Sequence, residues 1–433
     1  MKPVTARRRT GSQSAQTSSR VAGSRRHRAD HRLMLFMGLL ILVGLIVLFA
    51  ISPYQIHRIN TEGGSLDQSH YMFKQLAYLG IGTGAFIAGS LLPLALWRKV
   101  AGPLVITALT LCALLALLGA FSAPPAMCFN GACRWFDLGF ISFQPAEFLK
   151  FAVVVFAAVF LGQRMKAGKI NNVQDTLVPI VILLGLAMFF VIGLQKDMGT
   201  GITIVGALIA MMIVSGVSLR LLAIGGAGIL ALGSLLIMLS PHRVERIVTF
   251  LNHSSVTDAN SYHIDMAKVA IGSGGLFGKG LGNGVQAFGY LPEALNDSIF
   301  AVLGEIFGFI GLVIILGMFA ALLARIMRTS ERVSDPTMKL LAAGGFGWIA
   351  THVVVNIGAM TGILPLTGVT LPFLSFGGTS LLFMMATLGI IYQISRYTTF
   401  QLETKGGSDE TSRSGRRFRG ARNPGSSRHK RAI

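Results

Sequence analysis

Residues 33–51 read LMLFMGLLILVGLIVLFAI, a run of 19 residues without a charged side chain. This length matches the ~20 apolar residues that an α-helix needs to cross a hydrocarbon core of ~30 Å. The run is long for the apolar part of a cleavable signal, and no small-residue cleavage site follows it. We therefore expect a permanent transmembrane helix here.

Nine further apolar runs follow, so the sequence predicts an all-α, polytopic integral membrane protein with ten helices. Of the 433 residues 52% are hydrophobic and only 13% are charged, a balance that a water-soluble chain could not bury. The 52 glycines suit close helix packing in lipid. The expected spans are 33–51, 73–96, 103–121, 145–162, 176–194, 199–216, 220–240, 298–323, 340–360 and 372–395.

The basic residues predict the orientation of these helices. An even number of spans puts both ends of the chain on one side of the membrane. If that side is the cytoplasm, 29 of the 38 Lys and Arg residues lie inside, nine of them in residues 1–32 and ten in 396–433. This is the positive-inside pattern. We interpret 1–32 and 398–433 as disordered basic tails that flank a ten-helix domain at 33–397.

The net charge of +20 therefore follows from topology and basic tails. No aromatic or motif pattern accompanies the charge, so nucleic acid is not an expected partner. Anionic lipid at the membrane surface is the expected contact of the tails. The sequence contains no GxxxxGK[ST] loop, and most acidic residues fall on the outer side, so ATP hydrolysis is not expected.

Two short outer segments carry charge at the membrane edge. Arg134 precedes the segment FQPAEFLK, in which Glu147 and Lys150 are three residues apart and share a helix face. They form either an internal ion pair or, with Arg134, a contact to an anionic ligand. In the turn QKDMGTG, Asp197 is expected to cap the next helix, while Lys196 faces outward toward a substrate.

The longest outer segment is 241–297, between the seventh and eighth spans. Arg243 and Arg246 form a fork suited to phosphate oxygens, or they snorkel beyond a helix end. The glycine-rich run 271–284 permits close backbone approach to a ligand, and its Lys279 is a candidate phosphate contact. Asp297 is either the N-cap of the eighth span or a general base at the membrane surface.

A further outer turn, 361–380, is rich in Gly, Pro and hydroxyl groups, and Ser375 and Ser380 are candidates to bind a sugar or pyrophosphate. His352 and Asn356 share a helix face just before it, and we interpret them as a buried hydrogen-bonded pair. Cys128 and Cys133 lie in one outer loop, where a disulfide is favoured over two free thiols. No His or further Cys accompanies them, so a zinc site is not expected.

These pieces together resemble the SEDS family (shape, elongation, division and sporulation), which includes FtsW and RodA. The motifs that carry the resemblance run from residue 134 to 389, in the family's order and spacing: RW…FQPAEFLK, QKDMGTG, AIGSGGLFGKGLG, YLPEALND and HVVVNIGAMTGILPLTGVTLPFLSFGGTS. The basic N-terminal tail and Ala294 are more similar to the division member, FtsW.

The chain departs from the family's pattern at several positions near the key carboxylate. Leu295, Asn296 and Ser298 replace the usual His, Thr and Phe around Asp297, and His263 stands where Gln is usual. Ile306 stands where a second Glu often follows, and Cys133 replaces a common Arg. The aspartate itself is kept.

The resemblance implies ten helices with a large extracytoplasmic loop, and polymerisation of lipid II into peptidoglycan strands during cell division. Asp297 would be the general base, and undecaprenyl pyrophosphate the leaving group. Candidate contacts to substrate are Arg134, Glu147, Lys150, Lys196, Arg243, Arg246, Lys279, Ser375 and Ser380. A divalent cation, Mg or Mn, could assist, although no ligand cluster requires one; no organic cofactor is expected.

The implied partners are lipid II, a class B penicillin-binding protein that crosslinks the strands, and other membrane proteins of the divisome. The implied location is the bacterial cytoplasmic membrane at the septum. Two other functions remain open: a lipid II flippase, which is a transporter, and a non-catalytic scaffold of the division machinery. No half-to-half repeat of the kind found in many transporters is visible in the sequence.

Overall fold

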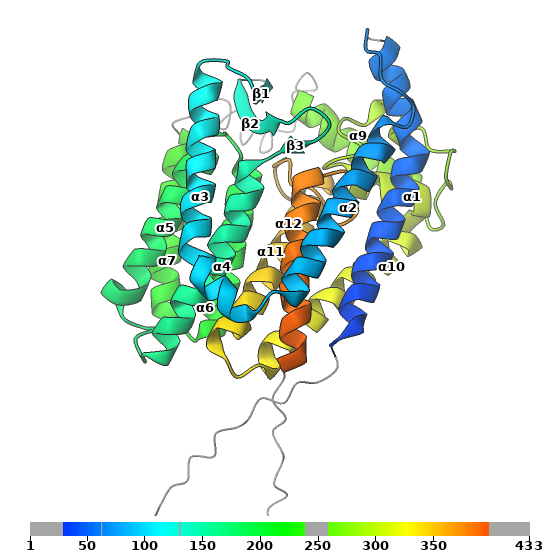
Figure 1. Ribbon diagram of the computed structural model, residues 1–433. Helices are drawn as coiled ribbons and strands as arrows, with labels where there is room; N and C mark the ends of the chain where they lie inside the picture. Colours follow the sequence, from blue (N-terminus) through cyan, green and yellow to red (C-terminus); the bar gives the residue numbers. More distant parts are fainter. Residues whose placement is uncertain (1–28, 62, 130, 239–258, 398–433) are drawn as a thin grey trace, which may run out of the picture. The chain divides into compact units, whose positions relative to one another are not determined.

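The computed structural model describes residues 29–61, 63–129, 131–238 and 259–397, and it is mostly helical (Figure 1). Three short strands, α9 and the turns around them lie at the upper end of Figure 1, opposite the start of α1 and the end of α12. The helices are α1 (His31–Thr61), α2 (His70–Leu91), α3 (Leu94–Ala120), α4 (Pro145–Lys166), α5 (Val178–Met188) between π-turns η1 (Val173–Leu177) and η2 (Phe189–Leu194), α6 (Met198–Ser215), α7 (Leu219–Met238), α9 (Ala259–Ser273), η3 (Gln286–Tyr290), α10 (Ile299–Arg332), α11 (Pro336–Met360), α12 (Gly378–Ile394) and η4 (Ser395–Tyr397).

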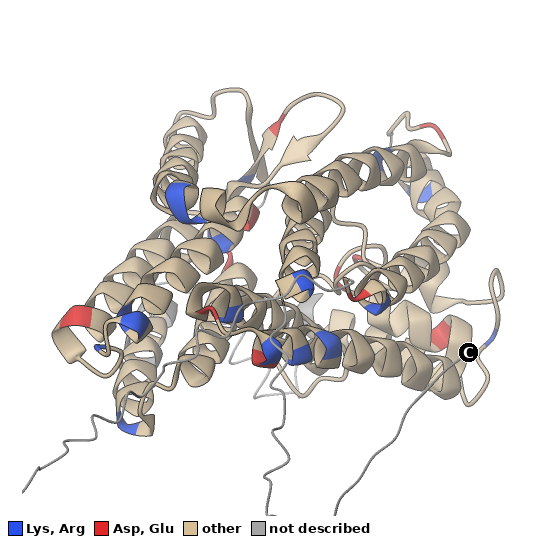
Figure 2. Cartoon of the chain, turned by 60° about the horizontal axis from the view of Figure 1, so that its bottom comes forward, with Lys and Arg blue, Asp and Glu red and all other residues tan. Residues whose placement is uncertain are grey.

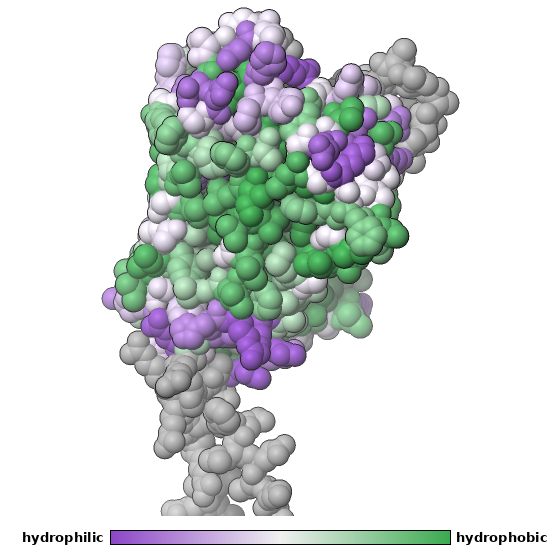
Figure 3. Space-filling model, turned by 90° about the vertical axis from the view of Figure 1, so that its right-hand side faces the viewer, coloured by the Kyte–Doolittle hydropathy of each residue, from purple (hydrophilic) through white to green (hydrophobic). Residues whose placement is uncertain are grey.

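The predicted all-α membrane architecture is confirmed. Among the described residues, eight helices are long and apolar enough to cross a membrane. The eight are α1, α3, α4, the continuous run η1–α5–η2, α6, α10, α11 and α12 with η4. Helix α2 and the described apolar part of α7, Leu219–Ile229, fall short of the same length or hydropathy. The count of ten spans therefore stays a prediction. Figure 3 shows a hydrophobic band between two hydrophilic ends on one face of the molecule.

Several helix boundaries differ from the predicted ones. Helix α1 continues ten residues beyond 51, through Pro53, and α3 begins at Leu94, so the loop expected at 97–102 is helical. The last span was predicted to begin at 372, but 371–377 is a turn and α12 begins at Gly378. Apolar residues in that turn extended the hydropathy signal, because burial against protein selects the same residues as burial in lipid.

Helices α4, α11 and α12 form the interior of the bundle. In their spanning windows 83%, 72% and 83% of residues are buried, against 28% in α3. Helix α12 packs along α2 so closely that a Cβ at Gly389 would lie 2.2 Å from the Phe86 carbonyl oxygen. A helix surrounded by protein can carry polar side chains that lipid would exclude. The interior helices α4 and α11 carry the polar residues described below.

Helix α10 is interrupted at Gly308, where φ is 66° and ψ is −169°. The break frees backbone groups on both sides of this residue, and in a membrane each must find a partner inside the protein. The glycine-rich segment 275–280 supplies those partners. Lys279 N and Gly280 N donate to the carbonyls of Glu305 and Ile306 at 2.9 and 3.0 Å. The Phe309 and Ile310 amides donate in turn to the carbonyls of residues 275 and 276 at 2.9 and 3.1 Å.

This segment thus approaches α10 closely, while approach of the run 271–284 to a ligand stays a prediction. Gly278 has φ 80°, and a Cβ there would lie 2.1 Å from the Ile306 carbonyl oxygen. The predicted loop 241–297 is also less irregular than expected, since α9 and η3 lie within it. Helix α9 packs on α10 and α11, with Ile264, Ala267 and Ala270 buried along one face.

The strands form a small antiparallel sheet in the order β1 (Ala126–Phe129), β2 (Ala132–Asp137), β3 (Ser142–Phe143). Cys128 and Cys133 are paired across β1 and β2, and a disulfide joins them. The sheet contacts the ends of α3 and α4.

At the opposite end, Asp335 joins three helices. Its carboxylate accepts from the first amides of α11, at Thr337 and Met338, and from Arg98 of α3 and Lys166 of α4 at 2.7 and 2.9 Å. Burial raises the pKa of the Asp335 carboxyl, but the hydrogen bonds from Lys166, Arg98 and Met338 outweigh it and bring the pKa below its ordinary value. Figure 2 turns this end forward and shows Lys and Arg on neighbouring helix ends.

We expect Gly278→Ala to lower the melting temperature of the detergent-solubilised protein by several degrees, because the new Cβ would push segment 275–280 off α10. Gly282→Ala is the matched control. The φ of Gly282 is 90°, so an alanine there has the same cost of about 1–2 kcal/mol for a left-handed backbone. A Cβ at Gly282, however, meets no atom within 4 Å. Equal shifts for the two variants, measured by thermal unfolding, would contradict the role assigned to the close contact.

Candidate functional site

Asp297 lies in the turn that leads into α10, and its side chain is half-buried. The N-cap of α10 is Ser298, so the interpretation of Asp297 as the cap is wrong. The turn is closed by the amides of Asn296 and Ser298, which both donate to the Glu293 carbonyl. This hydrogen bonding starts the helix one residue later than expected and leaves the Asp297 carboxylate beside the helix start.

Two residues of the turn 361–377 and one of α11 fix the backbone around Asp297. Asn356 Nδ2 donates to the carbonyls of Asp297 and Val369, both at 2.7 Å. The Phe376 amide donates to the Leu295 carbonyl at 2.8 Å. Gly368 faces the carboxylate, since a Cβ there would lie 3.9 Å from Asp297 Oδ2. The carboxylate is therefore held at the inner edge of the turn 361–377.

The serines predicted to bind a sugar have different surroundings. Ser375 is 5% exposed, and its Oγ accepts from the Leu371 amide at 2.8 Å, so it stabilises the turn itself. Ser380 Oγ is buried, and no hydrogen-bond partner for it is found among the described residues. Contact of either serine with substrate stays a prediction.

His263 and Ser298, two of the positions where the sequence departs from the family's pattern, contact each other. Ser298 Oγ lies 2.5 Å from His263 Nε2 and donates to the Pro292 carbonyl at 2.7 Å. Because the hydroxyl hydrogen is used on Pro292, His263 Nε2–H must be the donor to Ser298 Oγ. The pair ties α9 to the residue that directly follows Asp297.

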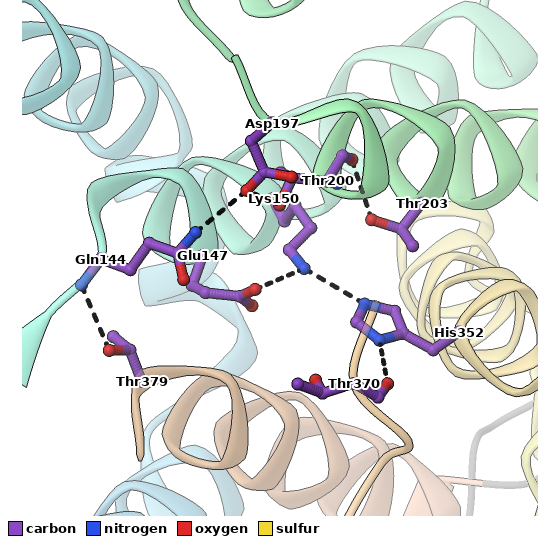
Figure 4. A network of polar contacts seen from close by, with 9 residues as sticks. All are labelled: Gln144, Glu147, Lys150, Asp197, Thr200, Thr203, His352, Thr370 and Thr379. Carbon is purple, nitrogen blue, oxygen red and sulfur yellow. Dashed lines mark hydrogen bonds and ion pairs between the residues drawn. The ribbon is translucent and has the colours of Figure 1, made fainter. Parts of the chain in front are cut away.

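Below this turn the interior helices enclose a buried ion pair (Figure 4). Lys150 Nζ lies 2.7 Å from Glu147 Oε1, and the two side chains are 2% and 7% exposed. The internal ion pair that the spacing allowed is thus confirmed. The ammonium also lies 5.5 Å from the centre of the Trp348 ring. A buried charge of this kind is stable only with a partner, so Lys150 depends on Glu147.

His352 completes the contacts of Lys150. Figure 4 shows the imidazole between Lys150 and the backbone of Thr370. Nδ1 lies 3.0 Å from the Thr370 carbonyl oxygen, which can only accept, so Nδ1 carries the hydrogen. Nε2 is then the acceptor from Lys150 Nζ at 3.1 Å. His352 is buried and hydrogen-bonded as expected, although to Lys150 and the turn rather than to Asn356.

Helix α11 thereby connects the two parts of the site. His352 and Asn356, one turn apart, bond to the consecutive residues Thr370 and Val369. Through these bonds the position of the Lys150 ammonium is coupled to the backbone of Asp297.

Asp197 caps α6, as predicted. Its Oδ1 accepts from the Thr200 amide at 2.9 Å, and its Oδ2 accepts from Thr200 Oγ1 and from Gln144 Nε2. The Gln144 amide in turn donates to Thr379 Oγ1 at 3.2 Å, which brings the starts of α4, α6 and α12 together (Figure 4).

The outer cations predicted to contact substrate are each engaged within the protein. Arg134 donates to the carbonyls of Gln195 and Lys196 at 3.2 and 2.8 Å. Lys196 Nζ donates back to the Gly131 carbonyl. Lys279 forms an ion pair of 3.3 Å with Glu305, which is fully buried and also accepts from the amides of residues 285–287. Arg243 and Arg246 lie outside the described residues.

Lys268 on α9 is a cation to which the sequence analysis assigned no role. The aliphatic part of its side chain packs against Gly362, where a Cβ would lie 2.5 Å from Lys268 Cε. The residue is exposed, and no ion pair is found for it in the part of the chain that the structure describes. The sequence showed only a lysine in the outer segment 241–297, Lys268, and a glycine in an outer turn, Gly362. Only the fold brings these two residues together.

A divalent cation at the site would need a group of carboxylate or imidazole ligands. Among the described residues no group of three or more His, Cys, Asp or Glu side chains is arranged to hold a metal ion. A divalent cation at the site stays a prediction.

Residues 30–400 match the family model described as cell cycle protein, FTSW_RODA_SPOVE. The chain is 34% identical to stage V sporulation protein E of Bacillus subtilis over 86% of this chain and 98% of that protein. It is 35% identical to the probable peptidoglycan glycosyltransferase FtsW of Coxiella burnetii over 76% and 87% of the two chains.

Two solved structures have a similar fold. One comes from a study of the structural coordination of polymerization and crosslinking by a peptidoglycan synthase complex, with a TM-score of 0.69, 25% identity and coverage of 85% of this chain and 98% of that chain. The other is the rod shape determining protein RodA of Thermus thermophilus, with a TM-score of 0.61, 25% identity and coverage of 85% and 97%.

We expect Glu147→Gln to destabilise the protein by about 3 kcal/mol or more, because it leaves Lys150 as a buried charge without a counter-ion. Asp175→Asn is the matched control. It removes an exposed partner of Lys169, at 3.2 Å with 54% and 34% of the side chains exposed, and should cost less than about 1 kcal/mol. Thermal unfolding would measure both. Adding Lys150→Met to Glu147→Gln should recover part of the loss, and failure to do so would contradict the assignment.

Proposed function

Because the chain belongs to the cell cycle protein family of FtsW, RodA and SpoVE, we propose that it is a peptidoglycan glycosyltransferase that polymerises lipid II with Asp297 as its general base. The observation that carries the assignment is the position of Asp297. It is a half-buried carboxylate whose backbone is fixed by Asn356 and the turn 361–377, at the edge of the membrane bundle. A base must be held in place before its substrate arrives, and this arrangement does so.

The reaction joins two lipid-linked sugars. The C4 hydroxyl of an acceptor sugar has a pKa far above 7, so a base must take its proton as the oxygen attacks. Asp297 accepts that proton while the acceptor oxygen bonds to the anomeric carbon of the donor. The bond from that carbon to the phosphate oxygen breaks, and undecaprenyl pyrophosphate leaves with the electron pair. An α-linked donor and a β-linked product require one in-line displacement with inversion.

The leaving pyrophosphate needs positive charge near it in the transition state. Lys268 is the described cation best suited to this task, because it is exposed and lies over Gly362 in the turn that also contacts Asp297. Arg134, Lys196 and Lys279 instead support the walls of the site through the contacts described above. We propose Arg243 and Arg246 as further contacts, supported by their spacing in the sequence.

The cellular setting of the reaction is also inferred. The basic residues at the helix ends support a cytoplasmic location for the start of α1 and the end of α12, by the positive-inside rule. Asp297, at the opposite end of α10, then faces the outer side of the membrane. A crosslinking transpeptidase, of the class B penicillin-binding type, is the proposed partner, supported by the fold shared with the peptidoglycan synthase complex. Division of the cell is the proposed setting, supported by the similarity to FtsW proteins.

We expect Asp297→Asn to lower the rate of glycan polymerisation by about 10²–10⁴-fold, since the amide cannot accept the hydroxyl proton. Polymer formed from lipid II by the purified protein with its partner would be measured by gel electrophoresis. Asp265→Asn, which removes an exposed carboxylate on α9, should retain the wild-type rate. Polymerisation at the wild-type rate by Asp297→Asn would refute the base assignment. Lipid translocation in liposomes without polymer would instead support a flippase, and neither activity would support a scaffold.

His263 and Ser298 are expected to act as positioning residues for Asp297. His263→Ala and Ser298→Ala should each reduce kcat by about tenfold, and the double variant should be no slower than the slower single variant, because both remove the same chain of hydrogen bonds. Ser273→Ala is the control, since Ser273 Oγ bonds only within α9. Rates that multiply in the double variant would show that the two residues act independently.

A further inference from the structure

A cavity of about 240 Å³ lies where α1 begins and α10 ends, far along α10 from Asp297. It is lined by Asp30, Thr329, Ser395 and four arginines, which are Arg32, Arg325, Arg328 and Arg332. We call it the basal arginine cavity. The proposed function uses none of these residues.

The cavity carries an excess of positive charge. Asp30 is the one acidic residue among the described residues of its lining, and its carboxylate is 3.5 Å from Arg325 and also accepts from the Arg32 amide at 3.1 Å. Its backbone amide donates to Ser395 Oγ at 3.0 Å, which holds Asp30 against the end of α12. One carboxylate therefore faces four guanidinium groups. The start of α1, at His31, adds the positive end of a 31-residue helix.

Stabilisation of α10 does not account for these arginines. Cations near the last turn of a helix are favourable, and Arg332 occupies that turn. Arg328 lies about one turn earlier and Arg325 about two, outside the reach of the unpaired carbonyls. With Arg332 they share one helix face, where like charges three and four residues apart repel. A bound anion would convert this repulsion into charge-assisted hydrogen bonds.

A second cavity, of about 480 Å³, adjoins the first and shares Arg32 with it. Its other lining residues are His31, Met34 and Leu35, and the last two are 41% and 56% exposed. Met34 and Leu35 begin the apolar surface of α1 that meets lipid. On the face shown in Figure 3, hydrophilic residues of this end lie directly below the hydrophobic band. The anion-binding groups thus lie at the depth of lipid head groups, with an apolar surface above them.

We propose that the basal arginine cavity binds the phosphate-bearing head group of an anionic phospholipid, with an acyl chain along Met34 and Leu35. A free phosphate ion would use the arginines but not the apolar cavity beside them. A lipid uses both, and basic cavities between transmembrane helices on the cytoplasmic side are known to suit anionic head groups. The bound lipid would connect α1, α10 and the end of α12 at the cavity.

The test uses the full-length protein in detergent, with binding of dioleoyl phosphatidylglycerol measured by native mass spectrometry. Dioleoyl phosphatidylcholine, glycerophosphoglycerol and inorganic phosphate are the comparison ligands. We expect phosphatidylglycerol to bind at least tenfold more tightly than each of the three. Equal binding of phosphatidylcholine would overturn the anionic preference. Equal binding of glycerophosphoglycerol or phosphate would overturn the lipid assignment in favour of a free phosphate compound.

Arg325→Gln/Arg328→Gln should weaken phosphatidylglycerol binding at least tenfold. Arg164→Gln/Arg220→Gln is the matched control, because it removes the same charge at the same end of the bundle but outside the cavity. Equal loss in both would show only a general surface attraction and overturn the proposal. Arg328→Gln alone, at an exposed position, provides the same comparison if the double variant does not fold. A melting temperature that phosphatidylglycerol raises in the wild type and in the control, but not in these variants, would support the site.

Discussion

The structure around the candidate site depends on the requirement that every backbone group inside a membrane has a hydrogen-bond partner. Helix α10 opens at Gly308, and the segment 275–280 replaces the bonds that the helix loses. Glu305, three residues before Gly308, then accepts through its carboxylate from the amides of residues 285–287. From there the chain passes through η3 to the turn that holds Asp297. The Asp297 carboxylate is thus positioned by a membrane helix that is interrupted at Gly308 and by the glycine-rich segment that bonds to it.

The sequence allowed the fold class and most helices to be predicted because hydropathy reports burial directly. It also allowed the Asp197 cap and the Glu147–Lys150 pair to be predicted, since both depend on residues three apart on one helix. The remaining features depend on contacts between residues distant in sequence. The glycines at 274–280 are typical of a ligand loop and of a close backbone contact alike. Only the position of α10 distinguishes the two.

Contacts between residues distant in sequence also explain why the partners of the outer cations were not predicted. A lysine or arginine at an outer membrane edge carries no sign of its partner in its local sequence. Lys279 is paired with Glu305, 26 residues away, and Arg134 with a turn 61 residues away. Lys279 and Arg134 are therefore bonded within the protein, whereas Lys268 is exposed. His263 and Ser298 form a similar case, because two separate departures from the family's pattern prove to be one hydrogen-bonded contact.

The contact between Lys150 and His352 has a consequence for biosynthesis. The two residues are 202 positions apart, so α4 enters the membrane long before the imidazole exists. Until then Glu147, on the same helix, is the counter-ion that lowers the free-energy cost of inserting the Lys150 ammonium into the membrane. The segment 275–280 is likewise translated before the break in α10 that it repairs, whereas Asn356 and the turn 361–377 follow. A ribosome that stalls before α11 would leave a bundle with its charges paired but with Asp297 not yet held. Asn356 and the turn 361–377, which hold the backbone of Asp297, are thus among the last parts of the bundle to be made.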